Sequence, residues 1–180
     1  MAKYLISAAV LSVAMFTTLT SPAFAEDSIT ADANAALQQL YASEPVAKMI
    51  GEKAKAVLVF PNIVKAGFIV GGQYGEGVLF INGKFVAHYN SVAASYGLQA
   101  GVQSFGYALF LMNDKALEYL KSSDGWEIGV GPSIVIVDKG KAKSLTTTTL
   151  QDDVYAFIFD QKGLMAGLGI QGSKITRLEK

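Results

Sequence analysis

Four lysines between residues 46 and 65 are the side chains of this sequence best suited to binding chemistry. Lys48, Lys53, Lys55 and Lys65 share that segment with one acidic residue, Glu52, so its formal charge is +3 (four lysines less one glutamate). A lysine close to an anionic lipid surface contributes about 1 kcal/mol of attraction. We therefore predict that these four lysines bind anionic lipid headgroups weakly and reversibly.

The spacing of three charged residues suggests how a helix would present them. Lys48, Glu52 and Lys55 recur at intervals of four and three residues, which places them on one helical face. The opposite face would carry an apolar stripe of Val46, Ile50 and Ala54. This layout is typical of a helix at a membrane interface, and also of a solvated helix packed on its own sheet.

The remaining chemistry in the chain is sparse. The sequence has no cysteine and one histidine, His88, which excludes thiol catalysis and a two-histidine metal site. Asp152 and Asp153 are adjacent, and adjacent residues of a strand point to opposite faces, so we interpret them as a turn or strand entry. The G-x-G-x-x-G pattern at residues 167–172 is followed by too few residues for a dinucleotide-binding unit. We predict no catalytic residue, no metal, no cofactor and no enzymatic activity.

The balance of charge narrows the choice of partners. Fifteen basic and fifteen acidic residues leave a formal charge near zero. This argues against nucleic acid, because duplex binding requires a basic face. A second basic cluster falls on a predicted hairpin, where we expect it to keep a sheet edge soluble. Its members are Lys139, Lys141 and Lys143.

The elements that must position these residues divide the chain into three parts. Residues 1–25 have the pattern of a secretory signal peptide. We therefore expect an exported product, periplasmic or peripheral on the outer membrane. Residues 26–180 are predicted to form one domain. It has a helical front over residues 30–55 and a glycine-rich β region over residues 56–178, since all 18 glycines follow residue 50.

Capping residues predict the helices. Thr30 or Asp32 can cap a first helix, and Ser43 can cap a second helix that has Pro45 in its first turn. A short helix is also expected over residues 113–122, where it interrupts the β region.

Alternation and turn residues predict the strands. Asn82-Gly83 supplies the positive φ angles of a type I′ turn, so residues 77–81 and 84–89 should form a hairpin. An apolar run over residues 57–60 ends at Pro61. Further strands are expected over residues 67–74, 96–103, 105–112, 126–137 with a break at Pro132, 143–150, 154–159 and 164–178.

Small and polar residues repeat on one face of a predicted strand. Gly97, Gln99, Gly101 and Gln103 alternate with larger apolar residues. Glycine inside a strand indicates sharp curvature or the close approach of another backbone. We predict an α+β fold, with a strongly curved antiparallel β-sheet or closed barrel, N-terminal helices and one inserted short helix. A groove left open for an acyl chain is the alternative interpretation.

Several motifs in this order resemble the SYLF domain family. The similarity covers roughly residues 45–178, nearly the whole chain after the signal peptide. The motifs are AVLVFP at residues 56–61, KAGFIVGGQYGEG at 65–77, ASYGLQAGVQ at 94–103 and YALFLM at 107–112.

The resemblance implies a lipid-binding module. Eukaryotic members bind phosphoinositides, some fungal members bind or bundle actin, and bacterial relatives are exported proteins. This sequence shows no SH3 or FYVE domain, and an exported bacterial protein is not expected to meet phosphoinositides or actin. We therefore expect another anionic phospholipid, or a membrane surface bound peripherally, as the partner.

Three alternatives to lipid binding stay open. The first is an envelope protein-interaction or structural module without a lipid ligand, which would use an exposed sheet edge or residues 146–149 to contact an envelope protein partner. The others are an integral outer-membrane barrel and an enzyme.

Overall fold

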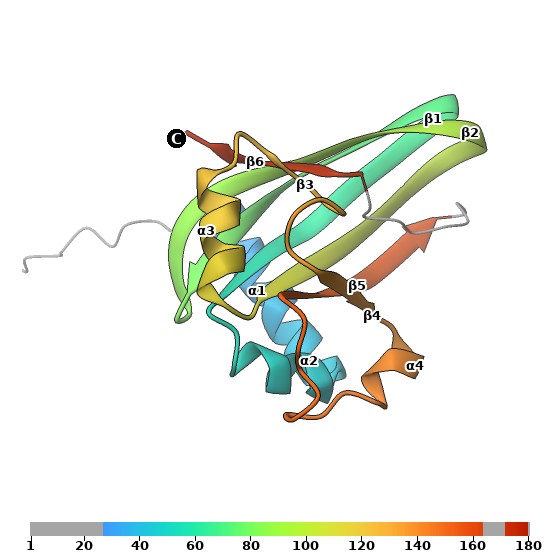
Figure 1. The fold of residues 1–180 in the computed structure, drawn as a ribbon. Helices are drawn as coiled ribbons and strands as arrows, with labels where there is room; N and C mark the ends of the chain where they lie inside the picture. The colour runs from blue at the N-terminus through green and yellow to red at the C-terminus, as the bar shows by residue number, and fades with distance from the viewer. Residues whose placement is uncertain (1–26, 164–171, 180) are drawn as a thin grey trace, which may run out of the picture.

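The computed structural model describes residues 27–163 and 172–179, which form an α+β fold around a strongly curved sheet (Figure 1). This confirms the predicted fold class. The predicted signal peptide, and most of the pattern at residues 167–172, lie outside the described residues. The elements are α1 (Ser28–Ser43), α2 (Pro45–Gly51), β1 (Ala56–Ile81), β2 (Lys84–Leu111), α3 (Asp114–Ser122), β3 (Trp126–Glu127), β4 (Ile134–Val137), α4 (Lys139–Ala142), β5 (Val154–Gly163) and β6 (Lys174–Leu178).

The helical front is present, but its helices begin at other residues than expected. Asp27 caps α1, because its Oδ1 atom accepts a hydrogen bond from the backbone N–H of Thr30 at 2.9 Å. The two residues predicted as caps therefore lie inside the helix. Pro45 opens α2 as expected. Ser43 does not cap α2, since its hydroxyl donates to the Leu40 carbonyl at 3.2 Å.

β1 and β2 form one long antiparallel ribbon of 26 and 28 residues. They join at Asn82-Gly83, whose φ angles of 51° and 71° confirm the predicted tight turn. β1 does not end at Pro61. A bulge between Phe60 and Ile63 leaves the proline, which has no N–H to donate, outside the ladder. The shorter strands expected separately along this stretch are parts of the same ribbon.

The ribbon doubles back at its middle (Figure 1). We call this region the bend and define it as residues 62–75 of β1 and 91–104 of β2. A Cβ atom at Gly75 would lie 2.5 Å from the Asn62 carbonyl oxygen on the facing arm of β1, and Gly77 is similarly restricted. Glycines of β1 therefore permit close approach of a second backbone here.

The sheet has six strands in the order β3-β6-β2-β5-β4, with β1 on the other edge of β2. β4 and β5 run parallel while the other pairs are antiparallel, so the sheet is mixed. β5 and β6 both pair with β2, and the offset between paired residues is the same for the two strands: Gln103 lies opposite Gly163, and Val92 lies opposite Lys174. Among the described strands, no pairing closes the sheet into a barrel.

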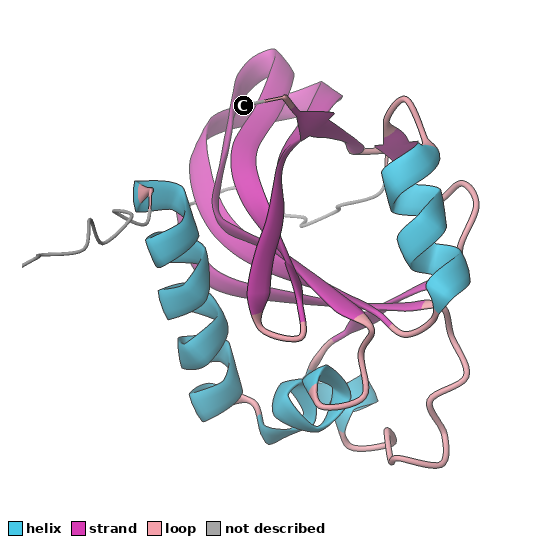
Figure 2. Cartoon of the chain, turned by 90° about the vertical axis from the view of Figure 1, so that its left-hand side faces the viewer, coloured by secondary structure: helices cyan, strands magenta, loops and turns pink. Residues whose placement is uncertain are grey.

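The curved sheet separates two apolar clusters, with α1 and α2 on one side and α3 on the other (Figure 2). On its inner face, side chains such as Phe60, Tyr107 and Leu109 form a core that α3 and Trp126 cover. On its outer face, α1 and α2 pack against the part of the ribbon farthest from the bend, which we call the base. The residues joining helices and base are Leu37, Leu40, Ala47, Ile50, Val59, Val78, Phe110 and Phe157.

The structure confirms two further predictions and contradicts one. α3 fills the expected position after its N-cap Asn113, and residues 126–137 divide into β3 and β4 on either side of Pro132. Residues 143–150 form turns instead of a strand. Local hydrogen bonds compete with sheet pairing: Asp138 caps α4 just before this segment by accepting from the Lys141 N–H at 2.7 Å, and within the segment Thr149 Oγ1 accepts from the Thr146 N–H at 2.8 Å. Consequently, the second basic cluster does not lie on a hairpin.

Candidate functional site

Three of the four predicted lysines lie at the helical front. Lys48 lies in the last turn of α2, and Lys53 and Lys55 follow in the connection to β1. All three are exposed, and Lys55 Nζ lies 3.6 Å from Asp114 Oδ2. We call them the front lysines. Because α2 ends at Gly51, the helical face expected to join Lys48 with Lys55 does not form.

Lys65 does not belong to this group. It lies nine residues after Ala56, which corresponds to about 30 Å along the strand. Its pairing partner is Gln103. Its side chain is buried on the inner face of the sheet, with 8% exposed. The structure therefore divides the predicted headgroup site into the front lysines and a lysine inside the bend.

A recess lies beside the front lysines. It has a volume of about 350 Å³ and lies between α1, the segment after α2, and the β1–β2 turn. Lys55 and Glu52 contribute the charged groups, and Leu37, Tyr41 and Phe80 contribute apolar surface. A cation beside an apolar hollow suits an amphiphile, although the neighbouring Glu52 opposes an anionic headgroup.

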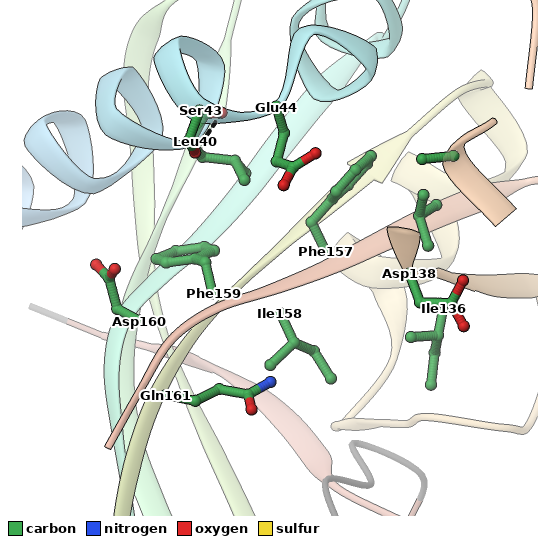
Figure 3. A pocket seen from close by; sticks show the side chains of 12 residues that line it. Leu40, Ser43, Glu44, Ile136, Asp138, Phe157, Ile158, Phe159, Asp160 and Gln161 are labelled. Atoms are coloured by element: carbon green, nitrogen blue, oxygen red, sulfur yellow. Dashed lines mark hydrogen bonds between the residues drawn. The ribbon is translucent and has the colours of Figure 1, made fainter. Parts of the chain in front are cut away.

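A larger cleft opens between the C-terminal end of α1, β4 and β5 (Figure 3). Its volume is about 510 Å³, and Phe157 and Phe159 form much of its apolar surface. Three carboxylates, those of Glu44, Asp138 and Asp160, line it. This concentration of negative charge repels anionic ligands, so the cleft is unsuited to the predicted headgroups.

The inner face of the bend is polar. Besides Lys65 it buries Gln73, whose Nε2 donates to Ser173 Oγ at 2.8 Å. The Tyr107 hydroxyl donates to Ser91 Oγ at 2.6 Å, and burial raises the pKa of Tyr107, so this phenol stays protonated at neutral pH. Buried polar groups of this kind require partners to offset their lost hydration.

The outer face of the bend is apolar and exposed, which sequence reasoning missed. Phe68 is 74% exposed, and Val70 and Val102 are each 63% exposed. Val64, Tyr74 and Val92 extend the same surface. The alternation that predicted a strand over residues 67–74 contained the signal, but it did not reveal which face meets solvent.

Two other predicted positions have structural roles. His88 lies buried in β2 with its Nε2 atom 2.8 Å from Asp27 Oδ2, so it helps to fix the start of α1. Asp153 lies at the entry to β5, as expected, and accepts hydrogen bonds from Asn113 Nδ2 at 2.8 Å and the Ser133 N–H at 2.9 Å. Chiefly through the Asn113 bond, these contacts lower the pKa of the Asp153 carboxyl.

Two features are absent from the described ranges. Within residues 27–163 and 172–179, no three histidine, aspartate or glutamate side chains gather as metal ligands. No helix in those ranges has the length and apolar character needed to cross a bilayer.

Comparison with known proteins found similarity at two levels. Residues 92–180 match the Ysc84 family model, described as Las17-binding protein actin regulator. Beta cell expansion factor A of Aeromonas veronii is 30% identical over 143 residues, which cover 79% of this chain and 53% of the relative. The chain therefore spans about half the length of that curated relative.

Proposed function

Because residues 92–180 place this chain in the Ysc84 (SYLF) family, we propose that it is a non-enzymatic protein that binds anionic phospholipid at a membrane surface. The binding is peripheral and reversible. The setting that fits the predicted signal peptide is the bacterial envelope, in the periplasm or on the outer membrane. The family description names Las17 and actin for other members, and an exported protein would not meet either.

The observation that carries the proposal is the concentration of lysines in segments almost free of acidic residues. The front segment, residues 46–55, has the three front lysines and one glutamate. The described segments that form and border the bend, residues 62–75, 91–104, 161–163 and 172–174, contain three lysines and no aspartate or glutamate. Each group can attract anionic headgroups by about 1 kcal/mol per lysine near the surface.

Vesicle sedimentation tests the function itself. The chain without residues 1–25 is mixed with vesicles of phosphatidylcholine alone or with phosphatidylglycerol added, at low and high salt. We expect sedimentation with the anionic vesicles at low salt and release at high salt, because salt screens exposed charges. Equal recovery in the supernatant under all conditions would reject lipid binding and favour the envelope protein-interaction module.

A charge-reversal pair tests the front lysines as the predicted headgroup contact. If Lys48 and Lys53 meet the membrane, Lys48→Glu with Lys53→Glu should weaken binding to anionic vesicles at least tenfold, since each lysine lost removes about 1 kcal/mol. Lys141→Glu with Lys143→Glu is the matched control, because these lysines are also exposed and lie outside the proposed contacts. Equal binding by both double variants would remove the front lysines from the contact.

A further inference from the structure

We propose that the outer face of the bend is the surface that enters a bilayer containing anionic phospholipid. This inference rests on the proposed function and names the part of the protein that contacts the lipid. Figure 1 places the bend at the far end of the ribbon from α2. One rigid molecule cannot press both ends against one flat bilayer, so the front lysines then stay in water.

The two faces of the bend carry the polarity expected of a sheet in lipid. The inner face buries Lys65, Gln73 and Gln103, while the outer face exposes Phe68 and Val102. A sheet in water has the opposite arrangement, with its apolar side chains inside. Apolar residues outside and polar residues inside are the pattern of strands whose outer face contacts acyl chains.

The apolar outer face continues past the helices that cover it. At the base, outer-face residues such as Val59 and Val78 pack under α1 and α2. Beyond the base, the same face of β1 carries Val64, Phe68 and Val70, each at least 43% exposed. In the part of the chain that the structure describes, helical cover is therefore confined to the base, and an exposed apolar patch of this kind marks an interaction surface.

Lysines border the apolar surface on both arms of the bend. Val64 pairs with Ser104, which pairs with Lys162, and Tyr74 pairs with Val92, which pairs with Lys174. Directly paired residues project from the same side of a sheet, so Lys162 and Lys174 lie on the outer face, and both are exposed. Lys174 also pairs with Glu127 of β3, and the Tyr74 hydroxyl donates to Glu76 Oε1 at 3.0 Å, so carboxylates offset the lysine on that arm. On the other arm, residues 161–163 contain no acidic residue, so the border at Lys162 is complementary to anionic headgroups.

The dimensions suit insertion into one leaflet. Four residues separate Val64, in the row of Lys162, from Phe68 near the turn of the bend, which is about 13 Å of strand. The hydrocarbon core of a bilayer is about 30 Å thick. Phe68 and Val70 can therefore reach acyl chains while Lys162 and Lys174 remain among the headgroups of the same leaflet. Deeper entry is opposed, because the edge of β1 carries backbone groups that lipid cannot satisfy.

Cysteine labelling tests the surface directly, because the chain has no cysteine of its own. Phe68→Cys and Val102→Cys are each labelled with an environment-sensitive fluorophore. Phe85→Cys and Val130→Cys are the matched controls, since both side chains are about half exposed and lie outside the bend. With phosphatidylglycerol-containing vesicles we expect the emission at positions 68 and 102 to shift to the blue and to fall at least twofold with brominated acyl chains. The emission at positions 85 and 130 should not change.

A second set of variants measures the contribution to binding. Val70→Asp with Val102→Asp should weaken vesicle binding at least tenfold, while Val130→Asp should change it less than threefold. If unlabelled protein sediments with anionic vesicles but the labels at 68 and 102 stay in water, insertion of the bend is refuted and the proposed function stands. If unlabelled protein does not sediment, both fail. If the labels respond to protein concentration without vesicles and a dimer elutes, the face belongs to a second copy, which also refutes the proposal.

Discussion

A pair of glycines three residues apart in β1 should respond to the same substitution with opposite signs. Gly75 lies on the inner face of the bend, where an added Cβ atom would lie 2.5 Å from the Asn62 carbonyl oxygen and 3.1 Å from the Ile63 Cα atom. Gly72 lies on the outer face, where the nearest atom to an added Cβ is the Ala93 carbonyl oxygen at 3.7 Å. Alanine therefore fits at one position and not at the other.

The expected magnitudes follow from two opposing effects. Replacing glycine by alanine in a strand gains about 0.5–1 kcal/mol, because the unfolded chain loses conformational freedom. Forcing a methyl group against backbone that cannot move costs about 1–3 kcal/mol. Gly72→Ala should therefore stabilise the protein by about 0.5 kcal/mol, and Gly75→Ala should destabilise it by about 1–2 kcal/mol.

Urea unfolding followed by tryptophan fluorescence measures both variants, since Trp126 is the single tryptophan and is fully buried. With a urea m-value of about 2 kcal/mol per molar, the midpoint should rise by about 0.3 M for Gly72→Ala and fall by about 0.5–1 M for Gly75→Ala. Midpoints that move together, or a Gly75→Ala protein as stable as the parent, would refute the tight return of β1 on which the bend depends.

Two further predictions concern titratable groups. Tyr107→Phe should lower stability by about 1 kcal/mol at pH 8, because it removes the buried donor to Ser91. Burial raises the pKa of Tyr107, so only the unfolded state releases this proton just above pH about 10. The parent should therefore lose more stability than Tyr107→Phe between pH 8 and pH 11, as measured by urea unfolding at both pH values. The pKa of Asp153 is lowered, chiefly by Asn113, so its stabilisation is present above pH about 4 and is lost as the pH falls further. Asp153→Asn should therefore melt below the parent at pH 7, and the difference between the two proteins should be smaller at pH 3 in thermal scans.

Local signals made part of the fold predictable. Asn82-Gly83 has one favoured turn geometry, and residues 113–122 combine a cap with a helical apolar stripe, so both predictions are confirmed. The turns at residues 143–150 were missed because side-chain hydrogen bonds, such as those of Asp138 and Thr149, outweigh strand propensity. The return of β1 on itself depends on contacts between distant residues, and no local pattern encodes their partners.

The candidate site was only partly predictable, because sequence distance converts to space differently in each element. Lys55 and Lys65 are ten residues apart, which is about 15 Å in a helix but about 33 Å in a strand. The segment between them is strand, so Lys65 leaves the front lysines and enters the bend. The front lysines are exposed, but the four lysines of the predicted headgroup site do not form one surface.

The alternation of β1 defines two faces without deciding which of them is the inside. At the base the question does not arise, because Leu58 and Val59 are both apolar and both covered. In the bend, the distribution of side chains between the two faces is unfavourable in water, since Lys65 and Gln73 are buried while Phe68 and Val70 are exposed. If the two faces of the ribbon were exchanged, the polar side chains would be exposed and the apolar ones buried. The register of β1 with β2 and the close approach at Gly75 hold the observed arrangement in place. An arrangement that lowers stability in water is explained if this face of the bend functions in contact with lipid.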